Sequence, residues 1–208
     1  MNVLHIIATP RGAKSTTLQV TKTFLDALTR KHGSLSVTEL NLFDADLPAA
    51  AGDTIESKYA LMMGMGLDEA QAHNWKGIEA LAKQFLDADL VVISSPLWNF
   101  GVPYALKYYI DALVQPGLLF HYTEQGPAGL VPPGKKMVVI TSRGGDYSVG
   151  SPFHAFDFQE PYLRAIFGFV GVTDVQFVHA QPVDMGPDPR AAALKAAHDQ
   201  ATAIAEGI

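Results

Sequence analysis

The sequence contains no cysteine, so disulfides, thiolate chemistry and Cys-ligated metals are excluded. Charged residues make up only 17% of the 208 residues, against a soluble average of about 25%, which favours a large core or a buried subunit interface. The net charge of −6 argues against a nucleic-acid surface, which needs a basic patch. No apolar run is long enough for a transmembrane helix. The first residues lack the basic segment of a signal peptide, so we expect a cytoplasmic protein.

Several common active-site motifs are also missing. The Walker phosphate-binding pattern needs glycine where this chain has Ala8 and Ala13. No G-x-G-x-x-G follows the first apolar segment, so the dinucleotide fingerprint is absent. The chain has no G-x-S-x-G motif and no histidine pair at metal-ligand spacing. The sequence therefore indicates neither a side-chain nucleophile nor a metal site.

Short apolar segments alternate with segments of helical periodicity. Short apolar runs predict β-strands at residues 2–8, 90–94, 136–142 and 173–180, and an alternating pattern rich in β-forming residues predicts another at 34–40, which makes five. The helical spacing predicts helices that begin after Ser15 and Pro103 and that cover about 55–63, 74–86, 157–168 and 188–207, the last with Asp188 as its N-cap. Residues 115–134, which are rich in glycine and proline, are expected to form a long loop.

This alternation predicts the fold class. Apolar strands joined by helices imply βαβ crossovers and a parallel sheet that is covered on both faces. We expect one flavodoxin-like domain over residues 1–208, a doubly wound α/β/α sandwich with a five-stranded parallel sheet in the order 2-1-3-4-5. In such a sheet, ligands bind at the carboxyl ends of the strands, where the chain reverses direction between strands 1 and 3.

The loop after the first strand offers ligands for a phosphate group. The stretch TPRGAKSTT (9–17) carries four hydroxyl side chains at the start of a helix, where the first N–H groups have no intrahelical partner. Hydroxyls and such amides bind phosphate, and Arg11 and Lys14 add positive charge. An ordinary N-cap beside a solvated basic loop explains the same residues equally well. If this loop binds a ligand, a monophosphate fits better than a triphosphate or a pyrophosphate.

The loop after the third strand carries Trp98, Asn99 and Phe100, followed by Gly101. Trp98 can lie against a flat aromatic ring, and Asn99 offers a donor and an acceptor to the edge of a heterocycle. Glycine lets main-chain N–H groups face a ligand. The alternative is an ordinary strand-to-helix connection in which Trp98 packs on a neighbour. The position of the loop at the expected reversal point favours ligand contact.

The loop after the fourth strand, TSRGGDY (141–147), contains a glycine pair. A tight turn explains two glycines by itself. Together with Ser142 and Arg143, they also suit close backbone approach to a ligand edge that carries negative charge. The three loops together suit a planar ring with a phosphate tail, and FMN has that shape.

Three stretches resemble one family closely. They are SPLWNFGVPYALKYYID (95–111), FHYTEQGPAGLVPPGKKMVVITSRGG (120–145) and PYLRAIFGFVGVTDV (161–175). They resemble the FMN-dependent NADH azoreductases, which are also described as FMN-dependent NADH:quinone oxidoreductases, and the resemblance covers nearly the whole chain. It implies a flavodoxin-fold homodimer with one FMN per subunit near the dimer interface.

The resemblance also implies roles for individual residues. The expected FMN ligands are Thr9, Arg11, Ser15, Thr16 and Thr17 at the phosphate, Pro96, Leu97, Trp98, Asn99 and Phe100 along the isoalloxazine, and Ser142, Arg143, Gly144 and Gly145 at its polar edge. Many members have serine in place of Thr9 and tyrosine in place of Trp98, and the wider indole leaves the fit of ring or substrate open. His121 and Tyr122 are candidates for shaping the substrate pocket, although a surface or interface role explains them equally well.

The chemistry implied by the resemblance belongs to the flavin, with no catalytic side chain required. NADH or NADPH would donate a hydride, and a quinone or azo compound would then accept two electrons in a ping-pong cycle. Two alternatives remain: a flavodoxin-type electron carrier without its own substrate, and a flavin-free relative of the fold that binds a nucleotide or acts in regulation. The segments 57–67 and 115–134 favour the enzyme, because they resemble walls around a site or an interface.

Overall fold

The computed structural model describes residues 1–49 and 51–208, with all of their side chains except those of Asp53 and Asn74. Five parallel strands form the main sheet, in the order β2-β1-β3-β6-β7. They are β1 (Asn2–Ile7), β2 (Ser36–Asn41), β3 (Leu90–Ser94), β6 (Lys136–Ser142) and β7 (Asp174–Ala180). The predicted strand order and the flavodoxin-like fold class are therefore confirmed.

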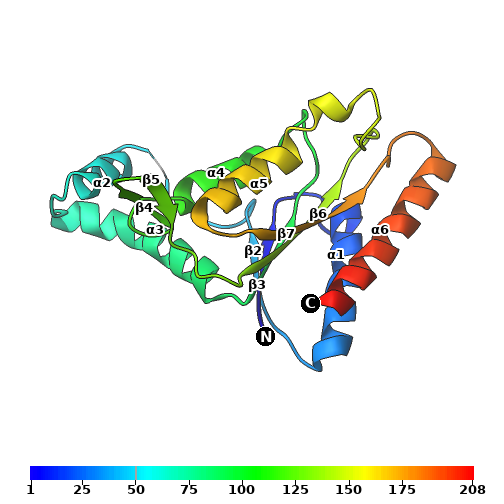
Figure 1. The fold of residues 1–208 in the computed structure, drawn as a ribbon, viewed down its shortest axis with the longest axis horizontal. Helices are drawn as coiled ribbons and strands as arrows, with labels where there is room; N and C mark the ends of the chain where they lie inside the picture. The colour runs from blue at the N-terminus through cyan, green and yellow to red at the C-terminus, as the bar shows by residue number, and fades with distance from the viewer. Residues whose placement is uncertain (50) are drawn as a thin grey trace.

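Helices cover both faces of the sheet (Figure 1). One face packs against α1 (Thr16–His32) and α6 (Pro187–Gly207), and the other against α3 (Glu69–Asp87), α4 (Tyr104–Leu113) and α5 (Gln159–Val170). Each face has its own apolar core. Phe24 and Val92 lie in the core beneath α1 and α6, whereas Phe85, Ile93 and Phe167 lie in the other core. Because β3 faces a core on each side, all five of its side chains are buried, as in other parallel sheets.

The prediction that residues 115–134 form one long loop is wrong. This segment contains an antiparallel hairpin, β4 (Phe120–Thr123) and β5 (Gly126–Gly129). The second strand, GPAG, contains no β-branched or aromatic residue and so carries no strand signal. Contacts with α5 stabilise the hairpin instead. The ring centroid of Phe120, on the partner strand β4, lies 4.9 Å from that of Phe169 on α5.

The last helix begins earlier than predicted. Gly186, and not Asp188, is its N-cap, and Pro187 is the first helical residue. Gly186 has a φ of 109°, a conformation that favours glycine, and prolines are tolerated in the first turn because no N–H is needed there. This start places Arg190 in the first turn of α6, where its N–H donates to the carbonyl of Gly186.

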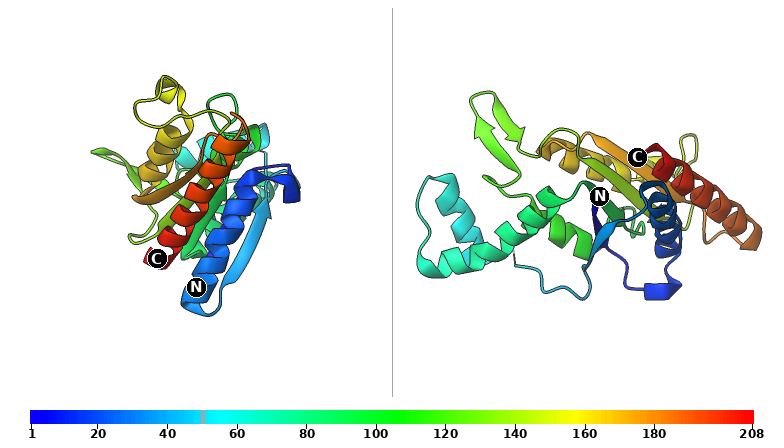
Figure 2. Two further views of the ribbon diagram at one scale, coloured as in Figure 1. Left: turned by 90° about the vertical axis from the view of Figure 1, so that its right-hand side faces the viewer. Right: turned by 90° about the horizontal axis from the view of Figure 1, so that it is seen from below.

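Part of the chain extends beyond the sheet. The short helix α2 (Asp53–Met62), the adjoining end of α3 and the β4–β5 hairpin project together at one end of the molecule, while the two termini lie close to each other near α1 (Figure 2). Across residues 1–49 and 51–208, no helix combines the length and apolarity needed to cross a membrane.

The hairpin is held against α5 by a close backbone approach, which generates a stability prediction. A Cβ on Gly129 would lie 2.3 Å from the carbonyl carbon of Val170, so Gly129→Ala must push the hairpin away from α5. We expect this substitution to lower the free energy of unfolding by about 1–3 kcal/mol.

Gly168 provides the matched control. It lies within α5, and a Cβ there would meet no atom within 4 Å. Gly168→Ala should raise the free energy of unfolding by about 0.5–1 kcal/mol, because alanine is the better helix former. Urea unfolding followed by circular dichroism measures both values, and equal effects of the two substitutions would contradict the proposed contact.

Candidate functional site

Three of the predicted loops meet where β1, β3 and β6 end. Backbone hydrogen bonds join the second loop to the end of β6, since the N–H of Ser95 donates to the carbonyl of Ile140 at 3.0 Å and that of Leu97 to the carbonyl of Ser142 at 2.9 Å. The N–H of Ala8, after β1, donates to the carbonyl of Ser94 on β3 at 2.8 Å. A cavity of about 130 Å³ lies between the loops. Its lining residues are Thr9, Arg11, Ser15, Thr16, Pro96, Leu97, Trp98, Ser142, Gly144, Val183, Asp184 and Arg190. Most of the predicted cofactor-binding residues thus line one cavity, whereas Thr17, Asn99, Phe100, Arg143 and Gly145 do not.

The first loop forms a wall of hydrogen-bond donors. Ser15 caps α1, and its Oγ accepts hydrogen bonds from the N–H of Leu18 at 3.3 Å and from the hydroxyl of Thr9 at 3.2 Å. Thr9, Ser15 and Thr16 are all buried. The first N–H groups of a helix have no intrahelical partner, and this end of the helix carries the positive pole of its dipole. This wall of the cavity therefore suits an anion.

Thr17 differs from the other hydroxyl residues of this loop. Its side chain is fully buried, and its Oγ1 lies 2.8 Å from the Oγ of Ser142, so its hydroxyl links the first loop to the third. A chain of hydroxyls continues below it. The hydroxyl of Thr21 donates to the carbonyl of Thr17 and lies 2.7 Å from the Oγ of Ser94, which lies 2.8 Å from Nε2 of His5. Burial lowers the pKa of His5, and Glu39 opposes this effect.

The segment after β7 supplies lining residues that sequence reasoning missed. Arg190 donates from Nη2 to the hydroxyl of Thr16 and from Nη1 to the carbonyl of Val183, both at 2.9 Å. The N–H of Asp184 donates to the carbonyl of Gly144 at 3.1 Å. A signal for this segment existed, because every strand-to-helix loop of a doubly wound sheet opens at the same edge.

The second loop is a tight turn. The N–H and carbonyl of Trp98 pair with those of Gly101 at 3.0 and 2.9 Å, and φ is 47° at Asn99 and 69° at Phe100. Positive φ at both central positions defines a type I′ turn, which usually contains Asn-Gly. Asparagine tolerates this conformation, but phenylalanine rarely adopts it, at a cost of about 1–3 kcal/mol. The carbonyl of Phe100 accepts from the N–H of Phe158 at 2.9 Å, which helps to hold the turn.

The side chain of Trp98 stands between the cavity and a second aromatic residue. The centroid of its ring lies 6.2 Å from that of Phe43, whose ring in turn meets Tyr104 edge-on at 5.6 Å. Trp98 keeps 36% of its surface exposed. Trp98 therefore packs on Phe43, remains partly exposed and lines the cavity.

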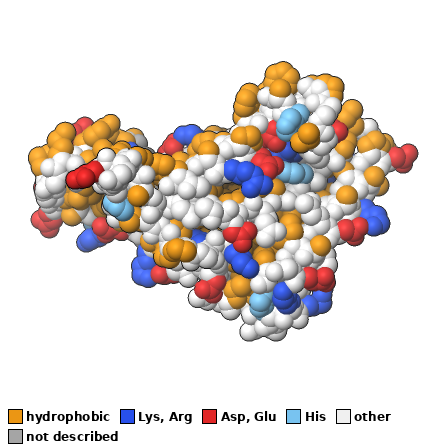
Figure 3. Space-filling view, viewed as in Figure 1, with side chains coloured by type: hydrophobic (Ala, Val, Ile, Leu, Met, Phe, Trp, Pro, Cys, Tyr) orange, Lys and Arg blue, Asp and Glu red, His pale blue; other side chains and the backbone are white. Residues whose placement is uncertain are grey.

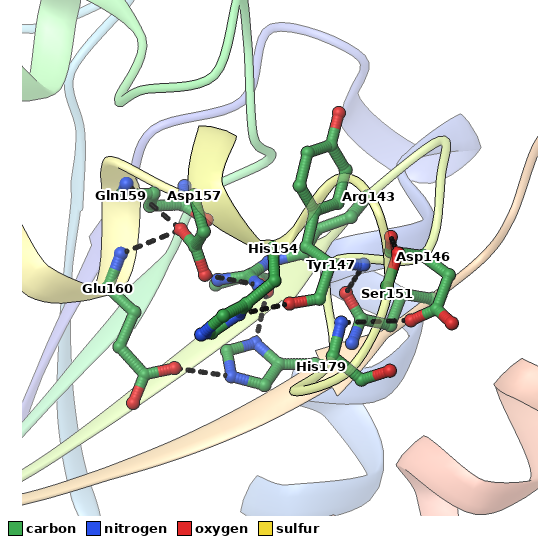
Figure 4. Close-up of polar contacts among 12 residues, drawn as sticks. Arg143, Asp146, Tyr147, Ser151, His154, Asp157, Gln159, Glu160 and His179 are labelled. Atoms are coloured by element: carbon green, nitrogen blue, oxygen red, sulfur yellow. Dashed lines mark hydrogen bonds and ion pairs between the residues drawn. The ribbon is translucent and has the colours of Figure 1, made fainter.

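The third loop is anchored by a buried ion pair. The side chain of Arg143 is 1% exposed, and its Nη1 lies 2.7 Å from Oδ2 of Asp157 (Figure 4). Burial lowers the pKa of Arg143, and Asp157 opposes this effect. The guanidinium therefore points into the protein and does not line the cavity, so only the backbone of Arg143 remains for the contact expected at a ligand edge. Gly144 approaches Asp184 closely, since a Cβ on it would lie 2.9 Å from Oδ2 of that residue.

Further polar contacts tie the start of α5 to the sheet. Oδ1 of Asp157 accepts from the N–H groups of Gln159 and Glu160 at the start of α5. The carboxylate of Glu160 lies 2.8 Å from Nε2 of His179, whose Nδ1 lies 2.9 Å from the hydroxyl of Thr141 on β6. Burial and the nearby Arg143 lower the pKa of His179, against the effect of Glu160. The start of α5 is thereby fixed to β6, β7 and the third loop.

His121 and Tyr122 lie elsewhere. They line a separate groove of about 480 Å³ between the β4–β5 hairpin and helices α2 and α3, together with Met62 and Trp75. Within this chain they do not meet the cavity of the three loops. Among the residues with described side chains, no three His, Asp or Glu gather in a way that would hold a metal ion.

Comparisons with known proteins agree with this architecture. A family model described as flavodoxin-like fold matches residues 1–205. An FMN-dependent NADH:quinone oxidoreductase from Nitratidesulfovibrio vulgaris is 39% identical over 204 residues, which cover 98% of this chain and 97% of the relative. An azoreductase structure from Bacillus anthracis str. Sterne has a TM-score of 0.90 at 31% identity, with both chains fully covered.

A second solved structure, an FMN-dependent NADH-azoreductase from Bacillus anthracis str. Ames Ancestor in complex with FMN, has a TM-score of 0.89 at 27% identity and covers 99% of this chain and 98% of its own. The family match and the relative both extend over almost the whole chain. The chain therefore belongs to the flavodoxin-like family of FMN-dependent NADH:quinone oxidoreductases and azoreductases.

Proposed function

We propose that the protein binds FMN and uses it to pass two electrons from NADH or NADPH to a quinone or an azo compound. The observation that carries this proposal is the cavity at the start of α1, lined by three hydroxyl residues of the first loop and by two arginines. The names of its relatives, FMN-dependent NADH:quinone oxidoreductase and FMN-dependent NADH-azoreductase, support the same cofactor and donor. We assign this function to a single domain over residues 1–208, in the cytoplasm.

The donor set of the cavity fits the terminal phosphate of FMN. Thr9, Ser15 and Thr16 would hold the phosphate oxygens through hydroxyls and helix-terminal N–H groups. Arg11 and Arg190 would balance its charge, while Asp184 brings one carboxylate to the same lining. A cavity of about 130 Å³ suits a phosphate better than a three-ring system. The isoalloxazine would therefore be bound by the second and third loops outside the cavity.

When bound, FMN would supply the redox chemistry, as hydride acceptor from the nicotinamide and as electron donor to the quinone or azo compound. The protein would bind and orient the reactants. Trp98 offers a partly exposed face to a planar ring, and Asn99 can bond to the edge of a heterocycle. Because donor and acceptor would use the same surface beside this loop, we infer that they bind in turn, in ping-pong order.

An electron carrier would need only a small exposed flavin edge, and the surroundings of the second loop favour the enzyme instead. The ring of Phe100 lies 5.2 Å from that of Phe156, which lies 6.5 Å from that of Phe153. All three rings are exposed. Such a group of aromatic side chains beside the turn suits the stacking of planar substrates.

We also propose a homodimer. Exposed apolar side chains gather at two ends of the molecule, over α2 and over the segment that follows β6 (Figure 3). Met63 at the end of α2 is 72% exposed, and Phe153 in the second group is 52% exposed. Large apolar patches on a protein surface mark interaction sites. The low charged fraction of 17% agrees with a buried subunit interface.

One prediction of the proposed function concerns the cofactor. Protein incubated with flavin should bind FMN in preference to FAD, because the enclosed cavity suits one terminal phosphate. Excess NADH should then bleach the flavin absorbance under anaerobic conditions, and a quinone should restore it. Chromatography of released flavin and stopped-flow absorbance measure both steps. Released flavin that runs as FAD would contradict the cofactor assignment, slow reduction by NADH would favour a carrier, and protein that stays colourless with FMN would favour a flavin-free relative.

The second prediction concerns Asn99. Asn99→Ala should weaken FMN binding or NADH turnover by more than about tenfold, as expected when a ring-edge hydrogen bond worth about 1.5 kcal/mol is lost. Fluorescence titration and steady-state kinetics measure the effect.

Asn99→Gly is the matched control, because glycine keeps the φ of 47° without strain and removes only the amide. If the amide contacts the flavin, both substitutions weaken binding to a similar extent. An effect of alanine alone would assign the loss to the backbone of the turn, and unchanged values for both would remove Asn99 from the site.

The third prediction concerns the dimer. Light scattering at low micromolar concentration should give the mass of two chains. Met63→Glu should shift the mass toward one chain, because a charge in an apolar interface is costly. Val37→Glu on β2, at a side chain 39% exposed and remote from both patches, should leave the dimer intact. A monomeric wild-type protein would rule out the proposed assembly.

A further inference from the structure

Arg190 connects three parts of the structure around the cavity. It belongs to the first turn of α6, its Nη2 donates to the hydroxyl of Thr16 on α1, and its Nη1 donates to the carbonyl of Val183 after β7. Thr16 and Val183 also line the cavity. The guanidinium is therefore held at the cavity by two hydrogen bonds from opposite sides.

Among the described residues, no carboxylate forms an ion pair with Arg190, although Asp184 lines the same cavity. The two hydrogen-bond acceptors of Arg190 are a hydroxyl and a backbone carbonyl, both neutral. Each guanidinium has five N–H donors in a fixed plane, so donors remain for a further acceptor. An anion in the cavity would neutralise the charge of Arg190 and accept hydrogen bonds from its remaining N–H groups.

Arg11, the other cation in the lining, lacks these constraints. Its side chain is exposed and makes no hydrogen bond or ion pair among those found in the described part of the chain. Ordering a free arginine on a ligand costs side-chain entropy, whereas Arg190 is half-buried and already fixed. Of the two, Arg190 is the one preorganised for a ligand.

We propose that Arg190 is the residue that selects phosphorylated flavin, which deepens the proposed function and rests on it. Its remaining N–H groups would donate to the FMN phosphate while Nη1 stays on the carbonyl of Val183. Riboflavin has the same ring and ribityl chain but no phosphate, so it gains nothing from this contact. Of the residues that would hold the phosphate, Arg190 is thus the one whose loss should most reduce the preference of the protein for FMN over riboflavin.

The test compares the two flavins on two variants. Arg190→Gln should raise the dissociation constant for FMN by about tenfold to a hundredfold, the loss expected for one or two hydrogen bonds to a charged group. The dissociation constant for riboflavin should change by less than about twofold. Arg190→Lys, which keeps the charge but not the planar fork, should lose an intermediate amount of FMN affinity. Quenching of flavin fluorescence measures each constant, with wild-type protein in parallel.

Arg30→Gln is the control for charge. It removes the same charge from the last turn of α1, at the opposite end of that helix from the cavity, and should leave both constants unchanged. Thermal unfolding of the flavin-free proteins checks that each variant folds. Equal losses for FMN and riboflavin in both Arg190 variants, or no loss for FMN, would overturn the role of Arg190 and leave the proposed function standing. Wild-type protein that binds neither flavin would overturn the proposed function itself.

Discussion

The guanidinium of Arg143 must be neutralised where it lies, because a buried charge without a partner is strongly destabilising. Loss of one partner of a buried pair costs about 3–5 kcal/mol. Asp157 meets this demand, and its Oδ1 also accepts a hydrogen bond from the N–H of Gln159 at the start of α5. The side-chain amide of Gln159 then donates to the carbonyl of Pro96 at 2.9 Å. One ion pair thus fixes the third loop, the start of α5 and the second loop in relation to one another.

The first loop is tied to the same assembly by hydroxyls. Thr17 meets Ser142, and Thr21 meets Ser94, so α1 is bonded through side chains to the ends of β6 and β3. Apolar contacts are non-directional, so they would allow α1 to slide along its axis over the sheet. The two hydrogen bonds fix its position along that axis. The start of α1 is thereby held at the ends of these strands, where Ser15 and Thr16 line the cavity. A binding edge made of three separate loops gains its rigidity from these polar links beneath it.

Four of the five sheet strands were predictable as short apolar runs, and β2 from its alternating pattern of β-forming residues. Their alternation with helices indicated a doubly wound parallel sheet, whose flavodoxin-like order placed the three loops at one edge. Three features of the structure could not be predicted from sequence periodicity. The β5 strand, GPAG, forms through contact with α5, against its own propensity. The sequence placed Arg143 correctly in the third loop, but its side chain turns inward to a carboxylate fourteen residues away. Arg190 was not predicted to line the cavity. The helix α6 begins at Pro187 after the positive φ of Gly186, whereas the sequence suggested a start at Asp188 and Pro189.

The substitution of tryptophan for the tyrosine common in the family has a physical consequence here. The turn holds Phe100 at a φ of 69°, and the paired backbone groups of Trp98 and Gly101 fix the ends of the turn. The wider indole then reaches Phe43, which follows β2, and Phe43 rests on Tyr104 at the start of α4. If the acceptor binds beside Trp98 as proposed, a shift of the indole to admit a bulkier acceptor would displace Phe43 or break its contact with Tyr104. The packing behind Trp98 would then limit acceptor size together with the indole itself.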